Sequence, residues 1–332
     1  MYAFKRFALA ASFIVTALPG FAQDLPVLDL YTYDSFAAEW GPGPALKAGF
    51  EKTCICTLAF TTSEDAISVL RKLQLEGTGT KADLVVGLDT ATAGEARATG
   101  LFAPHGLTLA GLKLPQAWSD PDFVPFDYGY FAYVYNKEKL PNPPTSFEEL
   151  IALPPSFKIV IEDPRSSTPG LGNVLWIETA YGERAPEIWK GLKPHILTMT
   201  RGWSEAYGLF LDGQADMVLS YTTSPAYHIV AENDERYAFA AFKEGHVAQI
   251  EVAGMLKSSD RPELAKAFLQ YLTTPEAQKL IPTTNWMYPV VDLGAELPAA
   301  FGPEPEKVLS IDEASITANS RSWVDAALAA LQ

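Results

Sequence analysis

Short apolar runs and amphipathic stretches alternate along the first third of the chain. Three runs have the length of buried strands, and they comprise residues 27–33, 56–61 and 83–87. Residues 64–75 carry apolar side chains at helical spacing, with Ser63 as a candidate N-cap and Gly77 as a stop. Residues 90–100 close a further strand–helix unit. This alternation predicts an α/β lobe with ligand-binding loops at the strand ends.

Two longer apolar runs differ from these and predict strands that cross between two lobes. Residues 126–136, FDYGYFAYVYN, are aromatic and almost continuously apolar, which is typical of a strand buried on both faces. Residues 247–256 form a second candidate crossing strand. A chain of 332 residues is too long for one ordinary core and suits two domains of about 150 residues each. We therefore expect an α/β protein with two lobes joined by two crossing strands.

The second lobe repeats the alternation of strand and helix. Its predicted strands are residues 158–162, 215–219 and 237–242. Its predicted helices start after the capping box of Ser146 and Glu149, near residue 171 and at Pro225, and further helices begin at Pro262, Pro275 and about Ile316. This organisation assigns residues 23–128 and 250–290 to the first lobe, and residues 129–249 and 291–332 to the second.

The N-terminus has the pattern of a secretory signal. Lys5 and Arg6 precede an apolar run, residues 7–18, and small residues follow before Gln23. The run is too short to span a membrane, and no cysteine follows the expected cleavage site. We expect residues 1–22 to be removed, leaving an exported, soluble protein without a lipid anchor there and without direct membrane insertion.

Charge narrows the range of partners. The apolar fraction, 48%, is ordinary for a globular protein, and without residues 1–22 the chain has 23 basic and 40 acidic residues, a net charge of −17. Such a surface repels nucleic acid and anionic membranes, and it tolerates cationic small molecules. Nucleic acid is therefore excluded as a partner.

Residues 202–228 hold the most informative stretch. A predicted strand runs directly into Ser220-Tyr221-Thr222-Thr223-Ser224, ahead of the helix at Pro225. Hydroxyl groups and free backbone N–H groups at a helix start suit a polar or anionic ligand group. Trp203 and Tyr221 lie at a helix entry and a strand end, where we expect them to line a pocket, whereas Tyr207 and Phe210 fit a core role better.

Other candidate binding residues occur at similar places. Tyr33 ends the first strand, Trp40 lies in the following loop, and Trp286 follows a helix. Asp65 is in the first turn of a helix, where a carboxylate either compensates the helix dipole or contacts a ligand. Ser166, Ser167 and Thr168 precede a helix of the second lobe. Aromatic rings with one carboxylate and two hydroxyl-rich turns suit a planar, cationic ligand that can carry phosphate.

Signatures of common enzymes and metal sites are incomplete. Residues 202–206, GWSEA, lack the last glycine of a nucleophile elbow, and residues 170–172, GLG, lack the third glycine of a dinucleotide motif. The four histidines are scattered, so we expect no metal site. Cys54 and Cys56 can pair in an exported protein, although the ring that they close is tight. A hydrolase or a dehydrogenase is therefore disfavoured.

Several motifs resemble one family over nearly the whole mature chain, namely YTYDSFAAEWGPGP (31–44), FVPFDYGYFAYVYNK (123–137), DPRSSTPGLG (163–172), GWSEAYGLFL (202–211), LSYTTSPAYH (219–228) and NWMYPV (285–290). They are similar to the periplasmic thiamine-binding proteins of bacterial ABC importers. The resemblance implies a type II periplasmic binding-protein fold with a ligand cleft between its lobes. It also implies a monomer in the periplasm that binds thiamine, thiamine monophosphate and thiamine diphosphate, needs no cofactor, and delivers its ligand to a membrane permease.

Site residues follow from the same resemblance. Asp65 and Ala66 would meet the aminopyrimidine side of the ligand, and Ser167 and Thr168 its phosphate or hydroxyethyl end. The hydroxyl-rich turn would meet that same end through Tyr221, Thr222, Thr223 and Ser224. The ring walls would come from Tyr33, Trp203, Tyr227 and Trp286, and a further polar N–H group from Trp40. The family also shows the Cys-x-Cys pattern of Cys54 and Cys56.

Two other functions stay open at this point. Thiamine-degrading enzymes share the fold and use a cysteine nucleophile, for which Cys54 and Cys56 are the only candidates in the sequence. The strand order places both cysteines away from the ligand-facing strand ends. A binding protein for ferric ion would need clustered tyrosines with a histidine and a carboxylate, and Tyr221, Tyr227 and His228 resemble this set only faintly.

Overall fold

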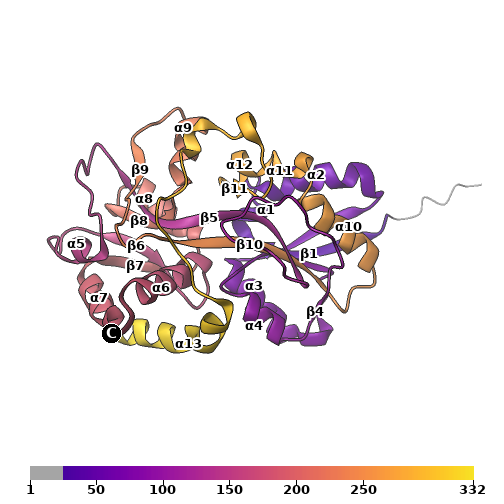
Figure 1. The fold of residues 1–332 in the computed structure, drawn as a ribbon, viewed down its shortest axis with the longest axis horizontal. Coiled ribbons are helices and arrows are strands. Elements are labelled where there is room, and N and C mark those ends of the chain that lie inside the picture. Colours follow the sequence, from indigo (N-terminus) through magenta and orange to yellow (C-terminus); the bar gives the residue numbers. More distant parts are fainter. Residues whose placement is uncertain (1–24) are drawn as a thin grey trace, which may run out of the picture.

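The computed structural model describes residues 25–332 (Figure 1), so the signal predicted at residues 1–22 lies outside the described residues. The main path of the sheet has the strand order β2-β1-β3-β10-β5-β8-β6-β7, and four short strands attach to β5 and β10. Helices cover both faces of each half of this sheet (Figure 1). None of the helices in the described part of the chain combines the length and the apolarity needed to cross a bilayer.

The first lobe is built on three parallel strands. Its strands are β1 (Val27–Tyr33), β2 (Thr57–Ser63) and β3 (Leu84–Asp89), with the short β4 (Phe102–Ala103) on β10. Its helices are α1 (Asp34–Ala37), α2 (Pro42–Cys54), α3 (Ala66–Glu76) and α4 (Ala93–Ala98). The three strands were expected at these places, and β1 has the predicted bounds.

The crossing strands are β5 (Phe123–Asn136) and β10 (His246–Leu256), which run through the centre of the molecule (Figure 1). The first half of β5 pairs with β10 and its second half pairs with β8, both antiparallel. At its other edge, β10 pairs with β3 of the first lobe. The prediction of two α/β lobes joined by two crossing strands is therefore confirmed, whereas the residue boundaries given for each lobe stay a prediction.

The second lobe contains β6 (Ile159–Glu162), β7 (Ile196–Thr200), β8 (Met217–Tyr221) and β9 (Tyr237–Phe239). Its helices are α5 (Phe147–Ile151), α6 (Thr168–Tyr181), α7 (Ala185–Leu192), α8 (Trp203–Leu211) and α9 (Ser224–Ala231). Its core is aromatic, because Trp176 packs among Tyr133, Phe147 and Phe242 with ring centroids 4.9–6.2 Å away. Helix α6 reaches β5 closely at Gly172, where a Cβ atom would lie 2.1 Å from the Phe131 ring.

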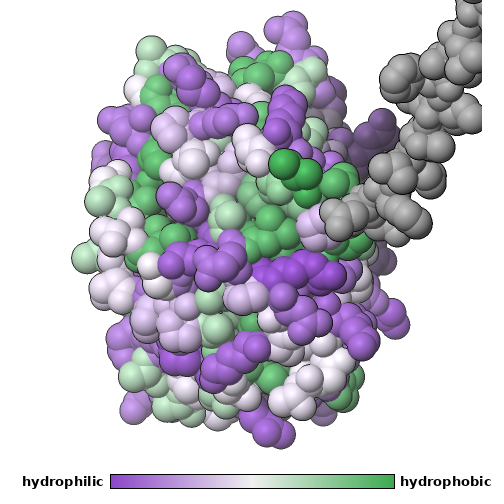
Figure 2. Space-filling view, turned by 90° about the vertical axis from the view of Figure 1, so that its right-hand side faces the viewer, coloured by the Kyte–Doolittle hydropathy of each residue, from purple (hydrophilic) through white to green (hydrophobic). Residues whose placement is uncertain are grey.

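The last part of the chain returns to both lobes. It comprises α10 (Pro262–Leu272), α11 (Pro275–Gln278), α12 (Ile281–Thr284), β11 (Tyr288–Pro289), β12 (Val308–Leu309) and α13 (Glu313–Ala330). Helix α13 contacts α6 and α7 of the second lobe and α4 of the first, along the lower edge of the view in Figure 1. Figure 2 shows the end of the molecule formed by the first lobe, where an apolar area near the centre lies among polar residues and smaller apolar areas occur elsewhere.

The predicted helix starts and stops were mostly correct, with one exception close to the candidate site. Gly77 ends α3 with φ of 54°, and the Ser146 hydroxyl accepts the Glu149 N–H bond. The prediction that Ser63 caps α3 is wrong, because Ser63 ends β2 and the cap is Asp65. The Asp65 carboxylate accepts the Ala66 N–H bond at 2.7 Å, so it satisfies a free N–H group of the first helical residue, whereas an N-cap side chain usually accepts from the second or third.

Candidate ligand-binding cleft

A cleft of about 530 Å³ opens between the two lobes. The first lobe contributes the carboxyl end of β1 and the start of α3, and the second contributes the starts of α6, α8 and α9. The crossing strand β10 and the loop after α12 supply the rest. Side chains on its wall include Tyr33, Trp40, Asp65, Ala66, Thr168, Trp203, Tyr221, Ser224, Tyr227, Gln249, Glu251, Asn285 and Trp286. Ligands of α/β proteins commonly bind at such strand ends, and the volume suits a small organic molecule.

Aromatic rings form much of the cleft wall, and their neighbours hold them in place. Trp203 stacks on Tyr207 with centroids 4.9 Å apart, and its indole N–H group donates to Ser220 Oγ at 2.8 Å. Trp40, which is 56% exposed, lies 6.4 Å from Trp203 at the same part of the wall. Fixed flat rings of this kind can stack on a planar ligand without losing side-chain freedom.

Tyr227 and Trp286 form a second aromatic pair, with centroids 5.3 Å apart and rings nearly perpendicular. Trp286 adopts φ of 57°, a left-handed conformation that costs free energy for a bulky residue. The backbone N–H group of Trp286 donates to the Ile281 carbonyl oxygen at 3.1 Å, which helps to hold the turn. Backbone strain of this kind clusters at functional sites, which supports a role for the Trp286 ring in the cleft.

Asp65 connects the two lobes at one end of the cleft. Besides capping α3, its carboxylate accepts hydrogen bonds from Ser167 Oγ at 2.7 Å and from the N–H groups of Thr168 and Trp203 at 3.3 Å each. The starts of α3, α6 and α8 therefore converge on one carboxylate. Gly202 permits this approach, because a Cβ atom there would lie 2.8 Å from the Glu64 carbonyl oxygen. Burial raises the pKa of Asp65, although these hydrogen bonds oppose the shift.

One contact here was not predicted. Asp65 was expected at the aminopyrimidine side of a ligand, and Ser167 and Thr168 at its phosphate or hydroxyethyl end. The direct contact between Asp65 and Ser167 brings these residues together at one end of the cleft, and the part of a ligand that each one meets stays a prediction. Sequence reasoning missed this contact because 102 positions separate the two residues.

The hydroxyl-rich turn after β8 is only partly on the cleft wall. Tyr221 and Ser224 line the cleft, and the Ser224 hydroxyl accepts the Tyr221 N–H bond at 3.2 Å. Thr222 and Thr223 are buried behind them, where the Thr222 N–H group donates to the Tyr130 carbonyl oxygen. Ser167 is also buried, since its hydroxyl faces Asp65. The structure thus brings ten of the thirteen predicted residues to the wall, and their contact with a ligand stays a prediction.

Two acidic residues in the crossing strands were missed entirely. Glu251 of β10 is on the cleft wall, and its ladder partner Asp127 of β5 is completely buried. Each carboxylate interrupts an otherwise apolar run, FDYGY around Asp127 and QIEVAG around Glu251. A charged residue in such a run was a readable signal, because burying an unpaired charge is costly.

Two of the residues considered for ferric ion, Tyr227 and His228, both bind the carboxylate of Glu232. His228 is fully buried behind the cleft, where its ring nitrogens contact the Tyr207 hydroxyl at 2.9 Å and Glu232 at 2.7 Å. The Tyr227 hydroxyl donates to the same Glu232 carboxylate at 2.9 Å. The imidazole therefore does not point at the Tyr221 hydroxyl as a shared metal ligand would.

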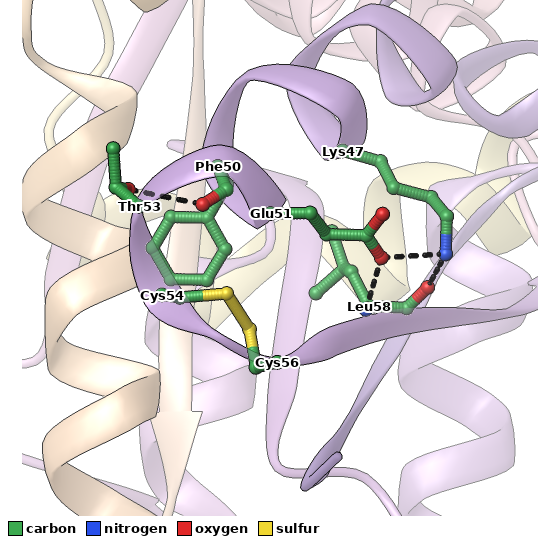
Figure 3. Close-up of a disulfide and its surroundings, with 7 residues drawn as sticks. All are labelled: Lys47, Phe50, Glu51, Thr53, Cys54, Cys56 and Leu58. Atoms are coloured by element: carbon green, nitrogen blue, oxygen red, sulfur yellow. Dashed lines mark hydrogen bonds and ion pairs between the residues drawn. A yellow bond between two sulfur atoms is a disulfide. The ribbon is translucent and has the colours of Figure 1, made fainter.

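Cys54 and Cys56 form a disulfide between the end of α2 and the start of β2 (Figure 3). Beside it, Glu51 accepts the Leu58 N–H bond at 2.7 Å and pairs with Lys47 at 2.9 Å. The disulfide precedes β2, whereas the cleft lies beyond the opposite, carboxyl end of that strand. Neither sulfur atom lines the cleft.

Comparisons with known proteins agree with this architecture. Residues 37–279 match the family model of bacterial extracellular solute-binding proteins. The thiamine-binding periplasmic protein of Brucella abortus is 51% identical over 320 residues, which cover 96% of each chain. That of Escherichia coli is 49% identical over 313 residues, 94% of each chain. A solved periplasmic thiamin binding protein superposes with a TM-score of 0.90 at 48% identity, covering 93% of this chain and 97% of that one. The chain therefore belongs to the bacterial extracellular solute-binding proteins, in the same family as the thiamine-binding periplasmic proteins of Brucella and Escherichia.

Proposed function

We propose that this protein captures thiamine in the periplasm and delivers it to the permease of an ABC importer. The observation that carries this proposal is the interlobe cleft, whose two aromatic pairs face a common space of about 530 Å³. Thiamine consists of two flat heteroaromatic rings, one of them cationic, and such rings bind well against tryptophan and tyrosine. Relatives at about half sequence identity, named as thiamine-binding periplasmic proteins, support the same ligand.

The proposal includes thiamine monophosphate and diphosphate as ligands. The donors at the starts of α6 and α8 are the Ser167 hydroxyl and the N–H groups of Thr168 and Trp203, and helix starts favour phosphate. In this structure all three donate to Asp65. A phosphate ester would have to compete with that carboxylate for them, whereas free thiamine would leave the contacts intact.

We also propose that the protein binds its ligand without chemical change and acts as a monomer. The relatives carry names of binding proteins, not of enzymes. The disulfide between Cys54 and Cys56 leaves neither sulfur as a free nucleophile. Release of a free pyrimidine or thiazole on incubation with thiamine would contradict this part of the proposal, and light scattering of the mature chain would test the monomer.

Calorimetric titration tests the function. We expect one molecule of thiamine to bind per chain in the micromolar range or below, and we expect both phosphate esters to bind at the same site in competition with thiamine. A titration with choline, a cation without aromatic rings, is the control and should show much weaker binding. An absence of thiamine binding at millimolar ligand would overturn the proposal.

A further inference from the structure

Two neighbouring carboxylates, one on the cleft wall and one buried behind it, have no basic partner. Glu251 and Asp127 are register partners on the antiparallel strands β10 and β5, and they are 6% and 0% exposed. Among the residues from 25 to 332, no lysine or arginine forms an ion pair with either one. Two neighbouring carboxylates in a buried site repel each other, and neutral donors cannot cancel their charge.

The neighbours of this pair supply hydrogen bonds but no positive charge. The Tyr33 hydroxyl donates to Glu251 Oε2 at 2.8 Å, and Asn285 Nδ2 donates to Asp127 Oδ2 at 2.6 Å. The second oxygen of Asp127, Oδ1, is buried and has no hydrogen-bond partner in the structure. These hydrogen bonds hold the two carboxyl groups in position, but none of their donors carries a positive charge.

Other groups that face Glu251 make the site more negative. Asp89 at the end of β3 and Asp65 at the start of α3 both act on it as like charges, in addition to Asp127. Burial raises the pKa of both carboxyls well above their usual range, and for Glu251 the neighbouring carboxylates add to the shift. On its own, the pair therefore tends to hold a proton. Because Glu251 is on the cleft wall, a cationic molecule in the cleft can take the place of that proton as the positive partner.

A glycine makes room for the tyrosine that binds Glu251. Gly87 in β3 has φ of 103°, and a Cβ atom there would lie 2.3 Å from the Tyr33 ring. Only glycine lets the Tyr33 ring take this position, from which its hydroxyl orients Glu251.

We propose that Glu251, backed by Asp127, is the counter-charge of the cleft and selects ligands that carry a fixed positive charge on an aromatic ring. The identity of that ring as the thiazolium of thiamine rests on the proposed function. A bound cation compensates the acidic pair, and a neutral ring of the same shape leaves it uncompensated. Glu251 is then a specificity-determining residue, and Asp127 acts through it.

The test compares thiamine with a neutral isostere in which carbon replaces the thiazolium nitrogen, giving a thiophene ring. Wild-type protein should bind thiamine at least about tenfold more tightly than the isostere. Glu251→Gln should weaken thiamine binding by about tenfold or more and change the affinity for the isostere by less than about threefold. Asp127→Asn should act in the same direction with a smaller effect.

Controls separate this effect from unfolding and from general charge. Glu205→Gln removes the same charge from an exposed residue of α8 and should leave both affinities unchanged. Thermal melts establish that the variants are folded. Equal losses for both compounds in Glu251→Gln, or a wild type that binds thiamine no better than the isostere, would overturn the counter-charge. A wild type that binds neither compound would overturn the proposed function itself.

Discussion

The substitution Asp65→Asn distinguishes the role of Asp65 as a helix cap from its role in the contact between the lobes. The two oxygens of Asp65 divide their four hydrogen bonds evenly. Oδ1 accepts the N–H bonds of Ala66 and Thr168, and Oδ2 accepts from Ser167 Oγ and from the Trp203 N–H group. An asparagine keeps the first oxygen and replaces the second with an NH₂ group. The cap of α3 should therefore survive, while the Trp203 N–H group faces another donor.

The expected magnitude follows from these contacts. The Ser167 hydroxyl can rotate to accept a hydrogen bond, but the backbone N–H group of Trp203 cannot. A buried donor without a partner costs about 1–3 kcal/mol, and the lost charge weakens the remaining bonds. Three of the four donors belong to the second lobe. Most of this cost therefore falls on the arrangement in which the two lobes are in contact through Asp65. We expect a loss of about 1–3 kcal/mol in unfolding free energy and a roughly ten- to a hundredfold loss in thiamine affinity.

Urea denaturation and calorimetry measure the two quantities, and small-angle scattering measures the opening of the ligand-free protein. Ser63→Ala is the matched control, because Ser63 lies just before α3 but does not cap it, and it should change neither stability nor affinity by a measurable amount. An Asp65→Asn variant within about 0.3 kcal/mol and twofold of wild type would refute the reasoning.

Three further predictions follow from other parts of the structure. Cys54→Ala/Cys56→Ala should lower the unfolding free energy by about 1.5 kcal/mol, since the loop closed by the disulfide is short, with thiamine affinity unchanged; an affinity loss in calorimetry would contradict the assigned geometry. Burial raises the pKa of Asp89 to about 6, so the stability that it contributes is complete below about pH 4 and is lost as the pH rises through 6. Asp89→Asn should remove that part of the pH profile, at most about 3 kcal/mol, and urea denaturation from pH 4 to 7 that leaves the profile unchanged would refute this. Trp203→Ala should weaken thiamine binding by about 1–3 kcal/mol, and a dissociation constant within twofold of wild type would exclude stacking on this ring.

The crossing strands could be predicted because their apolar runs are longer than those of the other strands, and the run in β5 is also strongly aromatic. Tyr33 and Tyr221 were also placed correctly on the cleft wall, since both end a strand and strand ends converge at one edge of a sheet. In contrast, Thr222 and Thr223 look equivalent to Ser224 in the sequence. Only the geometry at the start of α9 decides that their side chains turn away from the cleft.

Contacts between the lobes could not be predicted from the sequence, for a physical reason. The bond between Asp65 and Ser167 exists because two helix starts approach across the cleft, and local patterns contain no information about that approach. The acidic pair is different, since Asp127 and Glu251 each stand out within an apolar run. Their adjacency nevertheless depends on the register between β5 and β10, which periodicity alone does not determine.

A crystal structure of the protein with thiamine tests the central claim most directly. We predict that thiamine lies in the interlobe cleft, with its rings against Trp203 and Trp286 and its thiazolium nitrogen closer to Glu251 than to any other carboxylate. Thiamine bound outside this cleft, or bound within it with the cationic ring turned away from Glu251, would contradict the account.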